Sequence, residues 1–258
     1  MYNCEKQIVR VANQLTGEIS QYINEAIFIN NRSTDNGEKA IVEKLTSLNL
    51  NFPVKVLRNN ENYGLGGSHK VAFNYAINHG FDYVIVLHGD DQGSVSDFIP
   101  VLKEGIFRHY DCCLGARFMK ESKLPGYSKF RILGNKVFNI LFSIAIGKKI
   151  FDLGAGLNMY STKMLSSKYY MLFPDNLTFN CYMCFALAAF MQNHLYIPIT
   201  WREEDQISNV KMTRQAIQTL KMAINYFFKR QLFLQKDARS NKFEKYDSEV
   251  VYSKEISK

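Results

Sequence analysis

The sequence predicts an α/β fold, with a single large domain built around a mainly parallel central sheet. Short apolar runs rich in β-branched residues alternate along the chain with segments of helical periodicity, as expected for strands joined by crossover helices. The length of 258 residues suits one such domain with a sizeable core. No run of about eighteen uncharged apolar residues occurs, so we expect no transmembrane helix.

The expected elements follow from apolar periodicity and from the polar residues that bound each run. The clearest strand is the run Tyr-Val-Ile-Val-Leu at 83–87, and the clearest helix is the very apolar segment 129–146. The segment 210–235 is expected to be an amphipathic helix, because its apolar residues recur at helical spacing. The other strands are expected at 26–30, 54–57, 112–115, 157–160 and 195–200, and the other helices at 37–48, 68–78, 96–108 and 179–191.

The net charge of +8 is concentrated in two segments. Residues 117–149 contain eight basic residues and one acidic residue, and residues 211–236 contain six basic residues and no acidic residue. Such blocks favour a polyanionic partner: a membrane face, nucleic acid or a phosphorylated substrate. Both segments are also rich in Phe, Ile and Leu, which favours a membrane face. No nucleic-acid recognition motif is present, so we expect no nucleic-acid partner.

The cysteine pattern favours a reducing compartment. An odd number of five cysteines, without a recognisable secretory signal, is typical of cytosolic proteins with reduced thiols. Cys181-x-x-Cys184 could hold zinc, but no second Cys or His pair lies at ligand spacing, so we interpret both residues as core. Together with the basic segments, this predicts a cytoplasmic protein that is peripheral to the inner face of the membrane.

The segment His88-Gly89-Asp90-Asp91-Gln92 directly follows the strand expected at 83–87. Ligands of open α/β sheets bind at the carboxyl ends of the strands, where this segment would lie. Adjacent carboxylates there suit a hard divalent cation, Mg²⁺ or Mn²⁺, which would in turn hold a diphosphate. The alternative is that the two aspartates only form a turn or cap a helix.

Seven segments of the chain form an ordered set. They are 2–5 (Tyr-Asn-Cys-Glu), 27–35, 59–67, 88–92, 115–118 (Gly-Ala-Arg-Phe), 131–135 and 152–156 (Asp-Leu-Gly-Ala-Gly). In this order and at these spacings they resemble the family 2 glycosyltransferases, and most closely the branch of dolichyl-phosphate mannosyltransferase and bacterial polyprenyl-phosphate sugar transferases. The resemblance covers residues 1–212 and implies a glycosyltransferase A-type, Rossmann-like single domain.

By this resemblance, several segments would bind a nucleotide-sugar donor. Asn30 and Asn31 stand where Asp is usual in the family, and an amide can still hydrogen-bond a base or ribose. The glycine-rich loop before the helix at 68–78 permits close backbone approach and suits an anion. Simple turn chemistry and a helix cap by Asp35 are the alternatives for these loops. The expected donor-binding residues are Tyr2, Asn3, Glu5, Asn30, Asn31, Gly66, Gly67, Asp91, Gln92, Arg202 and Lys211.

The resemblance also implies a divalent-metal cofactor. The family motif is usually Asp-x-Asp-x-Gln. Aligned on Gln92, Asp90 takes the second acidic position and His88 replaces the first. We therefore expect Asp90 to bind Mg²⁺ or Mn²⁺, with His88 as a ligand of the metal or of a phosphate. The alternative for His88 is a packed histidine that weakens metal binding.

Three further residues are expected to act on the acceptor, which makes Asp90, Arg117, Arg131 and Asp152 the expected catalytic set. Arg117 and Arg131 match arginines that the mannosyltransferase branch uses toward an acceptor phosphate, whose oxygens suit the guanidinium fork. Asp152 resembles a carboxylate near the reaction centre that could act as general base or orient the acceptor. The alternatives are surface ion pairs for the arginines and a helix or turn cap for Asp152.

The resemblance covers a catalytic domain at 1–212; apolar periodicity predicts an amphipathic helix at 213–236, and the charged composition predicts a flexible tail at 237–258. The family's first apolar strand is not found before Tyr2. The predicted function is an inverting sugar transfer from a nucleotide sugar, with a polyprenyl phosphate at the cytosolic membrane face as the preferred acceptor. The alternatives are a transferase that extends a cell-surface glycan and a non-catalytic homologue that binds a nucleotide sugar.

Overall fold

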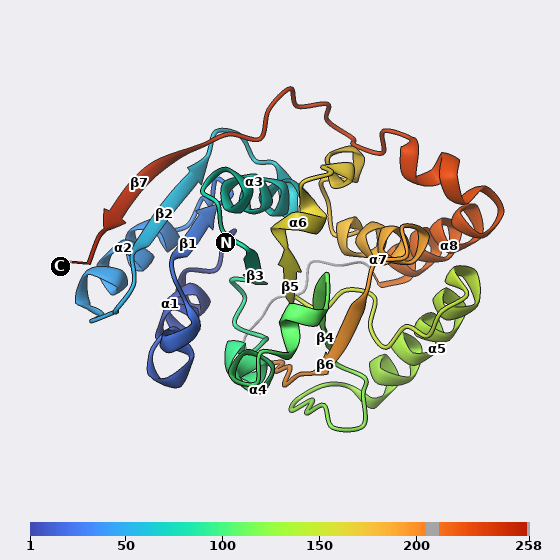
Figure 1. The fold of residues 1–258 in the computed structure, drawn as a ribbon, viewed down its shortest axis with the longest axis horizontal. Coiled ribbons are helices and arrows are strands. Elements are labelled where there is room, and N and C mark those ends of the chain that lie inside the picture. The colour runs from blue at the N-terminus through green and yellow to red at the C-terminus, as the bar shows by residue number, and fades with distance from the viewer. Residues whose placement is uncertain (205–211, 257–258) are drawn as a thin grey trace.

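The chain folds around two β-sheets flanked by helices (Figure 1). The computed structural model describes residues 1–204 and 212–256. The strands in that part of the chain are β1 Ala26–Asn30, β2 Val54–Asn59, β3 Tyr83–Leu87, β4 Cys112–Ala116, β5 Leu157–Ser161, β6 His194–Pro198 and β7 Ser248–Lys254.

Both sheets contain parallel and antiparallel pairs. The first has the order β1-β2-β7 and the second the order β3-β5-β4-β6. β1 is parallel to β2 and β4 is parallel to β6, whereas β7 is antiparallel to β2, and β5 is antiparallel to β3 and to β4. The α/β class is confirmed, but the expectation of a mainly parallel sheet is wrong. The His88 amide donates to the Gly156 carbonyl just beyond the carboxyl end of β3. The chain therefore enters β5 at that end and runs antiparallel to β3.

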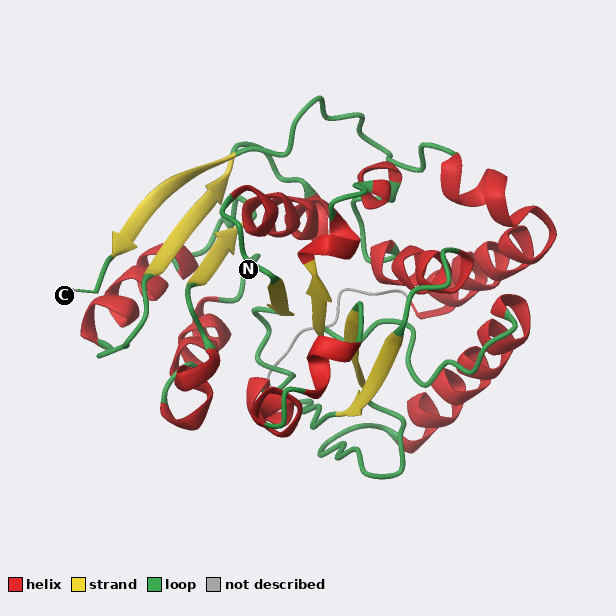
Figure 2. Cartoon of the chain, viewed as in Figure 1, coloured by secondary structure: helices red, strands yellow, loops and turns green. Residues whose placement is uncertain are grey.

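The C-terminal segment, expected to be a flexible tail, contributes a strand (Figure 2). β7 pairs with β2 along its length, and Glu249 forms an ion pair with Arg58 at 3.0 Å. Charged residues are compatible with β7 because an edge strand exposes much of its surface to water. The ladder with β2, about two hundred residues earlier in the chain, orders a segment that has little apolar content of its own.

The helices follow the apolar periodicity with two exceptions. α5 has the expected bounds and ends where Gly147 adopts a left-handed φ of 77°. The helix expected at 96–108 is broken into three short pieces, with Gly105 at a left-handed φ of 69°. A helix at 5–13 was not expected. The α-helices are α1 Glu5–Asn13, α2 Gly37–Ser47, α3 Gly64–Asn78, α4 Ile99–Lys103, α5 Lys129–Ile146, α6 Thr162–Leu165, α7 Phe179–Ala189 and α8 Met212–Gln235; short 3₁₀ helices span Gly17–Tyr22, Val95–Phe98, Ile106–His109 and Tyr169–Leu172.

The core occupies both faces of the second sheet. Val84 and Val86 of β3 pack with the cluster built on α7, while Tyr83, Ile85 and Leu87 pack with the cluster on the other face. Both faces are covered, so the strand is an unbroken apolar run rather than an alternating one. The cysteines of the described residues are free thiols. Buried Cys181 and Cys184 lie in α7, as expected for core residues.

A buried ion pair fastens the chain after α8 to the core. Lys70 is fully buried, and its Nζ donates to Asp175 Oδ1 at 2.7 Å and to the Phe173 carbonyl at 2.6 Å. The hydroxyl of Tyr246 donates to Asp175 Oδ1 at 2.8 Å and accepts from Lys70 Nζ at 3.1 Å. Burial lowers the pKa of Lys70, and these bonds to its ammonium oppose that shift.

The Tyr246→Phe substitution should lower the free energy of unfolding by about 1–3 kcal/mol, because it removes two hydrogen bonds from a buried charged pair. Urea unfolding measures the change. Tyr252→Phe is the matched control, because among the described residues its hydroxyl bonds only with the exposed Thr46, at 3.3 Å. It should cost less than about 0.5 kcal/mol. Equal losses for the two variants would contradict this role of Tyr246.

In the part of the chain that the structure describes, no helix is both long and apolar enough to cross a membrane.

Candidate active site

Three of the segments expected to bind the donor meet at the carboxyl ends of β1 and β3 (Figure 1). The Met1 amino group donates to the Ile29 carbonyl at 2.6 Å, and the Asn31 amide donates to the Met1 carbonyl at 2.9 Å. On the other side, a Cβ at Gly89 would lie 3.2 Å from Met1. Residues 1–5, 33–35 and 89–92 are called the donor junction below. It occupies the place where open α/β sheets bind their ligands.

The N-terminal residues are held against the loop after β1. Asn3 Oδ1 accepts from the Thr34 amide at 2.8 Å, and Asp35 Oδ2 accepts from the Glu5 amide at 2.9 Å. Asp35 therefore binds an amide at the start of α1, an unsatisfied donor in any helix. Tyr2 is half exposed beside this contact.

A surface cleft of about 550 Å³ lies next to the donor junction. This volume falls within the range of small-molecule sites. Glu38 and Arg58 form an ion pair in its wall, and the Arg58 hydrogen bond lowers the pKa of Glu38. The lining is wholly polar or charged, which suits a nucleotide better than an apolar ligand. Its residues are Asn30, Arg32, Ser33, Thr34, Asp35, Asn36, Glu38, Lys39 and Arg58.

Asn30 and Asn31 are buried, and their side chains are engaged in loop contacts. Asn30 donates to Glu38 at 2.6 Å and accepts from the Ser33 amide at 2.9 Å. Asn31 bonds with Asn59, Asn62 and the Tyr63 amide. Both amides shape the donor loops, and only Asn30 lies at the cleft wall.

The glycine-rich loop does not present free amides to an anion. The amides of Gly66 and Gly67 point at the Asp175 carbonyl, at 2.8 and 3.4 Å. A Cβ at Gly66 would lie 2.3 Å from the Pro174 carbonyl oxygen, and one at Gly67 would lie 2.4 Å from Tyr63 Cβ. The two glycines therefore allow close packing at the start of α3, and donor binding by them stays a prediction.

Asp90 follows β3 at the donor junction. One of its oxygens accepts from the Gln92 amide at 3.3 Å. Burial raises the pKa of Asp90, and the hydrogen bonds from the nearby backbone oppose that shift. Because burial disfavours the charged form of this carboxylate, a positive ligand bound beside it would favour that form.

Asp91 turns away from Asp90 and joins three parts of the chain. Its φ of 57° is left-handed, which directs the side chain to α1. Its carboxylate accepts from Arg10 at 2.6 Å, Gln14 at 2.8 Å and Arg202 at 3.1 Å. We expected donor binding by Asp91, but its charge is already paired inside the protein.

Gln92 and Arg202 hold the loop after β3 against the segment after β6. The Arg202 amide donates to the Gln92 carbonyl at 2.8 Å, and Gln92 Nε2 donates to the Arg202 carbonyl at 3.1 Å. Gln92 and Arg202 would therefore affect donor binding indirectly, by holding the donor junction in position. Lys211 lies outside the described residues.

His88 packs into the interior, and its ring leaves no room for a side chain in place of Gly156. A Cβ at Gly156 would lie 2.5 Å from His88 Nδ1 and 2.9 Å from Trp201. Burial lowers the pKa of His88 to about 4. The packed-histidine alternative describes this geometry, and among the described residues His88 belongs to no group of three or more His, Cys, Asp or Glu side chains that could hold a metal.

The neighbouring His69 gives the fold a predictable response to acid. It is buried, its Nδ1 bonds with the Leu65 carbonyl at 2.9 Å, and among the described residues its Nε2 has no hydrogen-bond partner. Burial lowers its pKa from 6.5 to about 3. Since the folded state binds this proton more weakly than the unfolded state, stability should fall as the pH drops from 6.5 toward 3, by at most about 1.4 kcal/mol per pH unit for one group.

In His69→Gln this contribution should disappear. Chemical unfolding across the acid range should give a shallower dependence on pH for the variant than for the wild type. Above about pH 7.5 the imidazole is neutral in both states, so the two curves should run parallel there. Equal slopes in the acid range would contradict the assignment.

A divalent metal would find one suitable carboxylate here. Within residues 1–204 and 212–256, no group of three or more His, Cys, Asp or Glu side chains could hold a metal. Mg²⁺ and similar ions are commonly held by one or two carboxylates together with substrate phosphates and water. Asp90 fits that arrangement, whereas the Asp91 carboxylate is paired with Arg10 and Arg202.

Arg117 and Asp152, expected to act separately on the acceptor, form a forked ion pair. Arg117 Nε and Nη2 donate to the two Asp152 oxygens at 2.7 and 2.8 Å, and the amides of Arg117 and Gly154 donate at 2.9 and 3.1 Å. Burial opposes the charge of Arg117, but the Asp152 carboxylate outweighs it and raises the pKa of Arg117; Asp90 adds to this effect. The Asp152 carboxylate accepts four hydrogen bonds in this structure, and two of them hold the Arg117 guanidinium in place.

Arg131 forms an ion pair with Glu203 and lies over the Tyr127 ring, with its guanidinium carbon 4.6 Å from the ring centroid. This is the ion-pair alternative for Arg131. Because Glu203 follows Arg202, the pair connects the first turn of α5 to the segment that holds Asp91 and Gln92.

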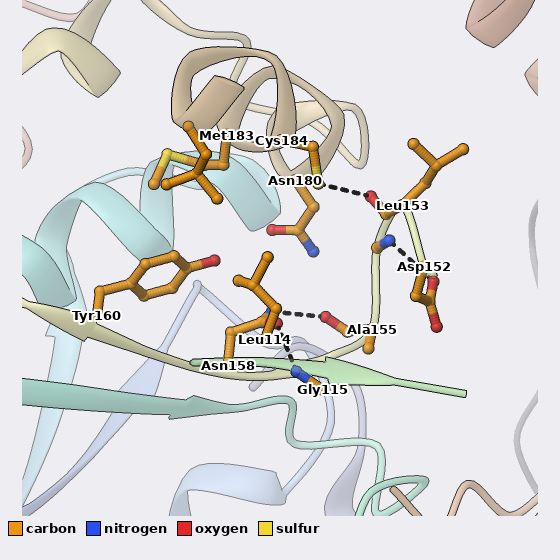
Figure 3. Close-up of a pocket in the computed structure, with 12 residues that line it drawn as sticks. Leu114, Gly115, Asp152, Leu153, Ala155, Asn158, Tyr160, Asn180, Met183 and Cys184 are labelled. Carbon is orange, nitrogen blue, oxygen red and sulfur yellow. Dashed lines mark hydrogen bonds between the residues drawn. The ribbon is translucent and has the colours of Figure 1, made fainter. Parts of the chain in front are cut away.

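A second, enclosed cavity of about 10 Å³ lies behind Asp152, between the 153–155 loop and α7 (Figure 3). This is room for about one water molecule and not for a sugar. Asn180 of α7 lines it, and the Asn180 Oδ1 has no hydrogen-bond partner among the described residues. The cavity therefore fits a structural water.

Sequence reasoning missed the residues of α1 that hold Asp91. Arg10 and Gln14 lie four residues apart, so they face the same side of α1. That spacing was the available signal. Trp201 was also missed: its ring lies 5.2 Å from the Arg117 guanidinium carbon, and Phe118 lies on that guanidinium too.

Comparison with solved structures places this fold among glycosyltransferases of the A type. Glucosyl-3-phosphoglycerate synthase from Mycobacterium tuberculosis, in complex with UDP, matches with a TM-score of 0.58 at 13% identity, over 88% of this chain and 77% of that chain. A complex of that enzyme with Mn²⁺, UDP and phosphoglyceric acid matches with a TM-score of 0.59 at 12% identity, over 88% and 75%. TarS (residues 1–349) of S. aureus matches with a TM-score of 0.54 at 15% identity, over 90% and 71%.

A comparison of sequences finds one curated relative and one family. The uncharacterized protein MJ1222 of Methanocaldococcus jannaschii is 26% identical over 120 residues, which are 46% of this chain. The chain spans about half, 49%, of the length of that relative. The family model of glycosyl transferase family 2 matches residues 1–167, well over half of the chain. Since this match covers more than half of the chain and the fold is of the A type, the chain belongs to glycosyltransferase family 2.

Proposed function

We propose that this protein transfers a sugar, with inversion, from a nucleotide sugar to an acceptor phosphate, and that the acceptor is a polyprenyl phosphate at the cytosolic face of a membrane. The acceptor oxygen attacks the anomeric carbon while the bond to the nucleoside diphosphate breaks. A divalent metal at Asp90, when bound, would stabilise the charge on the departing diphosphate.

The donor half of the proposal is supported by the donor junction and the adjoining polar cleft of about 550 Å³. The cleft would take the nucleotide, and Asp90 would lie near the diphosphate. UDP is the nucleotide in the first matching solved structure, so UDP-sugars are the first donors to test. The dolichyl-phosphate mannosyltransferase branch remains part of the proposal.

The acceptor half rests on the hydrogen bonds of Asp152. A hydroxyl acceptor needs a general base, whereas an acceptor phosphate is already ionised. Both oxygens of Asp152 are occupied by Arg117 and Gly154, so this carboxylate suits positioning rather than proton removal. Arg117, held beside Asp90, would then supply fixed positive charge to the phosphate.

A transfer assay tests the proposal. The purified chain is incubated with UDP-, GDP-, CDP- and dTDP-sugars, Mg²⁺ or Mn²⁺, and either polyprenyl phosphate or a soluble glycan. Sugar transfer to polyprenyl phosphate that chelator abolishes would support it. Transfer only to the glycan would favour the cell-surface alternative. Binding of a nucleotide sugar without transfer to either acceptor would favour the non-catalytic alternative.

A further inference from the structure

The exposed apolar surface of this protein is concentrated on two helices. Among the described residues, twelve of the eighteen large apolar side chains that are exposed belong to α5 or α8. Monomeric proteins in water rarely gather exposed apolar residues in this way, and such surfaces mark contacts with partners or membranes. They are Phe130, Leu133, Val137, Ile140, Leu141 and Ile144 of α5, and Ile217, Leu220, Ile224, Phe227, Phe228 and Leu232 of α8; together they are called the α5/α8 face.

Each helix is apolar on two opposite sides. The exposed residues of α5 recur every three or four positions, while Phe142, Ala145 and Ile146 of the same helix are buried. In α8, which has a kink at Lys229, the buried residues are Thr219, Met222, Ala223, Tyr226 and Leu234. A helix on the surface of a water-soluble domain should carry polar residues outward. The outward stripes of α5 and α8 therefore need a covering that the described part of the chain does not supply.

α5 and α8 are neighbours, and both pack on α7 (Figure 1). Phe142 of α5 stacks on Phe185 of α7 with ring centroids 5.0 Å apart, and Phe185 stacks on Tyr226 of α8 at 4.3 Å. Arg230 of α8 donates to the Ala145 carbonyl of α5 at 3.4 Å. Both buried sides thus converge on α7, and both apolar outer sides turn away from the sheets.

The charged residues along these two helices have one sign. Residues 129–149 contain basic side chains and no acidic one, and the same holds for 216–236. A second copy of the chain, docked by the same face, would bring these like charges together. An anionic lipid surface offers both an apolar interior and complementary headgroups. The basic side chains are Lys129, Arg131, Lys136, Lys148, Lys149, Lys221, Lys229, Arg230 and Lys236.

We infer that the α5/α8 face docks this protein on an anionic phospholipid bilayer, with both helices lying in the plane of the interface. This inference adds a membrane-binding surface to the proposed function. It rests on that function only in explaining what membrane docking would serve. Arg131, in the first turn of α5, pairs with Glu203, and Arg202 next to it pairs with Asp91. The docked face would therefore begin beside the loop of Asp90, where a lipid-linked phosphate could reach Arg117.

Vesicle co-sedimentation tests the inference without donor or acceptor, so its result is independent of transferase activity. The full chain is mixed with vesicles of phosphatidylcholine alone, or of equal parts phosphatidylcholine and phosphatidylglycerol. Binding should be strong to the anionic vesicles, weak to the neutral ones, and reduced by salt. Equal binding to both kinds of vesicle, or no binding to either, would overturn the inference.

Two variants locate the contact. Leu133→Gln/Ile144→Gln should weaken binding to anionic vesicles about tenfold or more, because each side chain would lose its insertion into the acyl boundary. Lys148→Glu/Lys149→Glu should weaken it by a similar factor through charge. Met191→Gln is the matched control, since Met191 is 84% exposed and lies outside both helices. It should bind as the wild type does.

Thermal unfolding and light scattering complete the test. The replaced side chains already face water, so Tm should stay within a few degrees of the wild type. If the α5 variant binds vesicles as well as Met191→Gln does, the face is not the docking site. If the wild type is a dimer that the α5 variant dissociates, a second copy covers the face and the membrane inference is wrong.

Discussion

Replacing Asp90 by asparagine should lower the kcat of sugar transfer by about 10²–10³-fold. The amide keeps the size of the side chain and removes the charge that would hold a metal ion and, through it, the departing diphosphate. Binding of the donor should lose its dependence on Mg²⁺ or Mn²⁺ for the same reason. Steady-state kinetics and a thermal-shift titration with UDP-sugars measure the two effects.

The Asp90→Asn variant should lose activity but not stability. Burial raises the pKa of Asp90, which means that the folded protein holds this carboxylate at a cost. The asparagine side chain carries no such charge, so the Tm of the ligand-free variant should equal or exceed that of the wild type. A gain in stability with a loss of activity is typical of residues kept for function.

The control for Asp90→Asn is Asp82→Asn, an exposed aspartate before the opposite end of the same strand. It should keep both activity and metal-dependent donor binding. If Asp90→Asn retains wild-type turnover, the metal assignment is wrong, because Asp90 is the carboxylate to which this proposal assigns the metal, whereas Asp91 is paired with Arg10 and Arg202.

The local apolar pattern predicted several strands and helices correctly. The strands at 26–30 and 83–87 and the helix at 129–146 have the predicted bounds, because apolar periodicity reports directly on which face is buried. β7 could not be predicted in this way, because its order comes from pairing with β2, far away in the chain.

In the site, as in the fold, features that depend on distant segments of the chain could not be predicted from local sequence. The order of the motifs indicated segments that do meet in the structure, at the donor junction where Asp90 lies, and donor binding there stays a prediction. The partners of the charged residues were not predictable, because ion pairs join distant segments: Arg117 and Asp152 are thirty-five residues apart, and Asp91 and Arg202 are one hundred and eleven apart. Asp90 and Asp91 look equivalent in the sequence. Only the left-handed backbone at Asp91 separates a carboxylate facing the junction from one that binds α1.

Asp152→Asn is expected to lower the free energy of unfolding by about 3–5 kcal/mol, because it leaves the buried Arg117 guanidinium with a neutral partner. The side chain of Asp152 is 2% exposed and that of Arg117 is 14% exposed, so water cannot replace the lost charge. Arg117→Met should cost a similar amount. Combining the two should cost less than the sum, because the double variant buries no unpaired charge. Urea unfolding of the four proteins gives the coupling free energy.

The half-buried pair of Arg131 and Glu203 is the control for this cycle. Its side chains are 32% and 23% exposed, so its coupling should be about 0–1 kcal/mol. Kinetics then separate the two roles of Asp152. If Asp152 positions Arg117, Asp152→Asn should raise the KM for the acceptor phosphate and leave the pH profile of kcat unchanged. If it is a general base, the acidic limb of that profile should vanish instead, and the four hydrogen bonds that its oxygens accept would have to open during turnover.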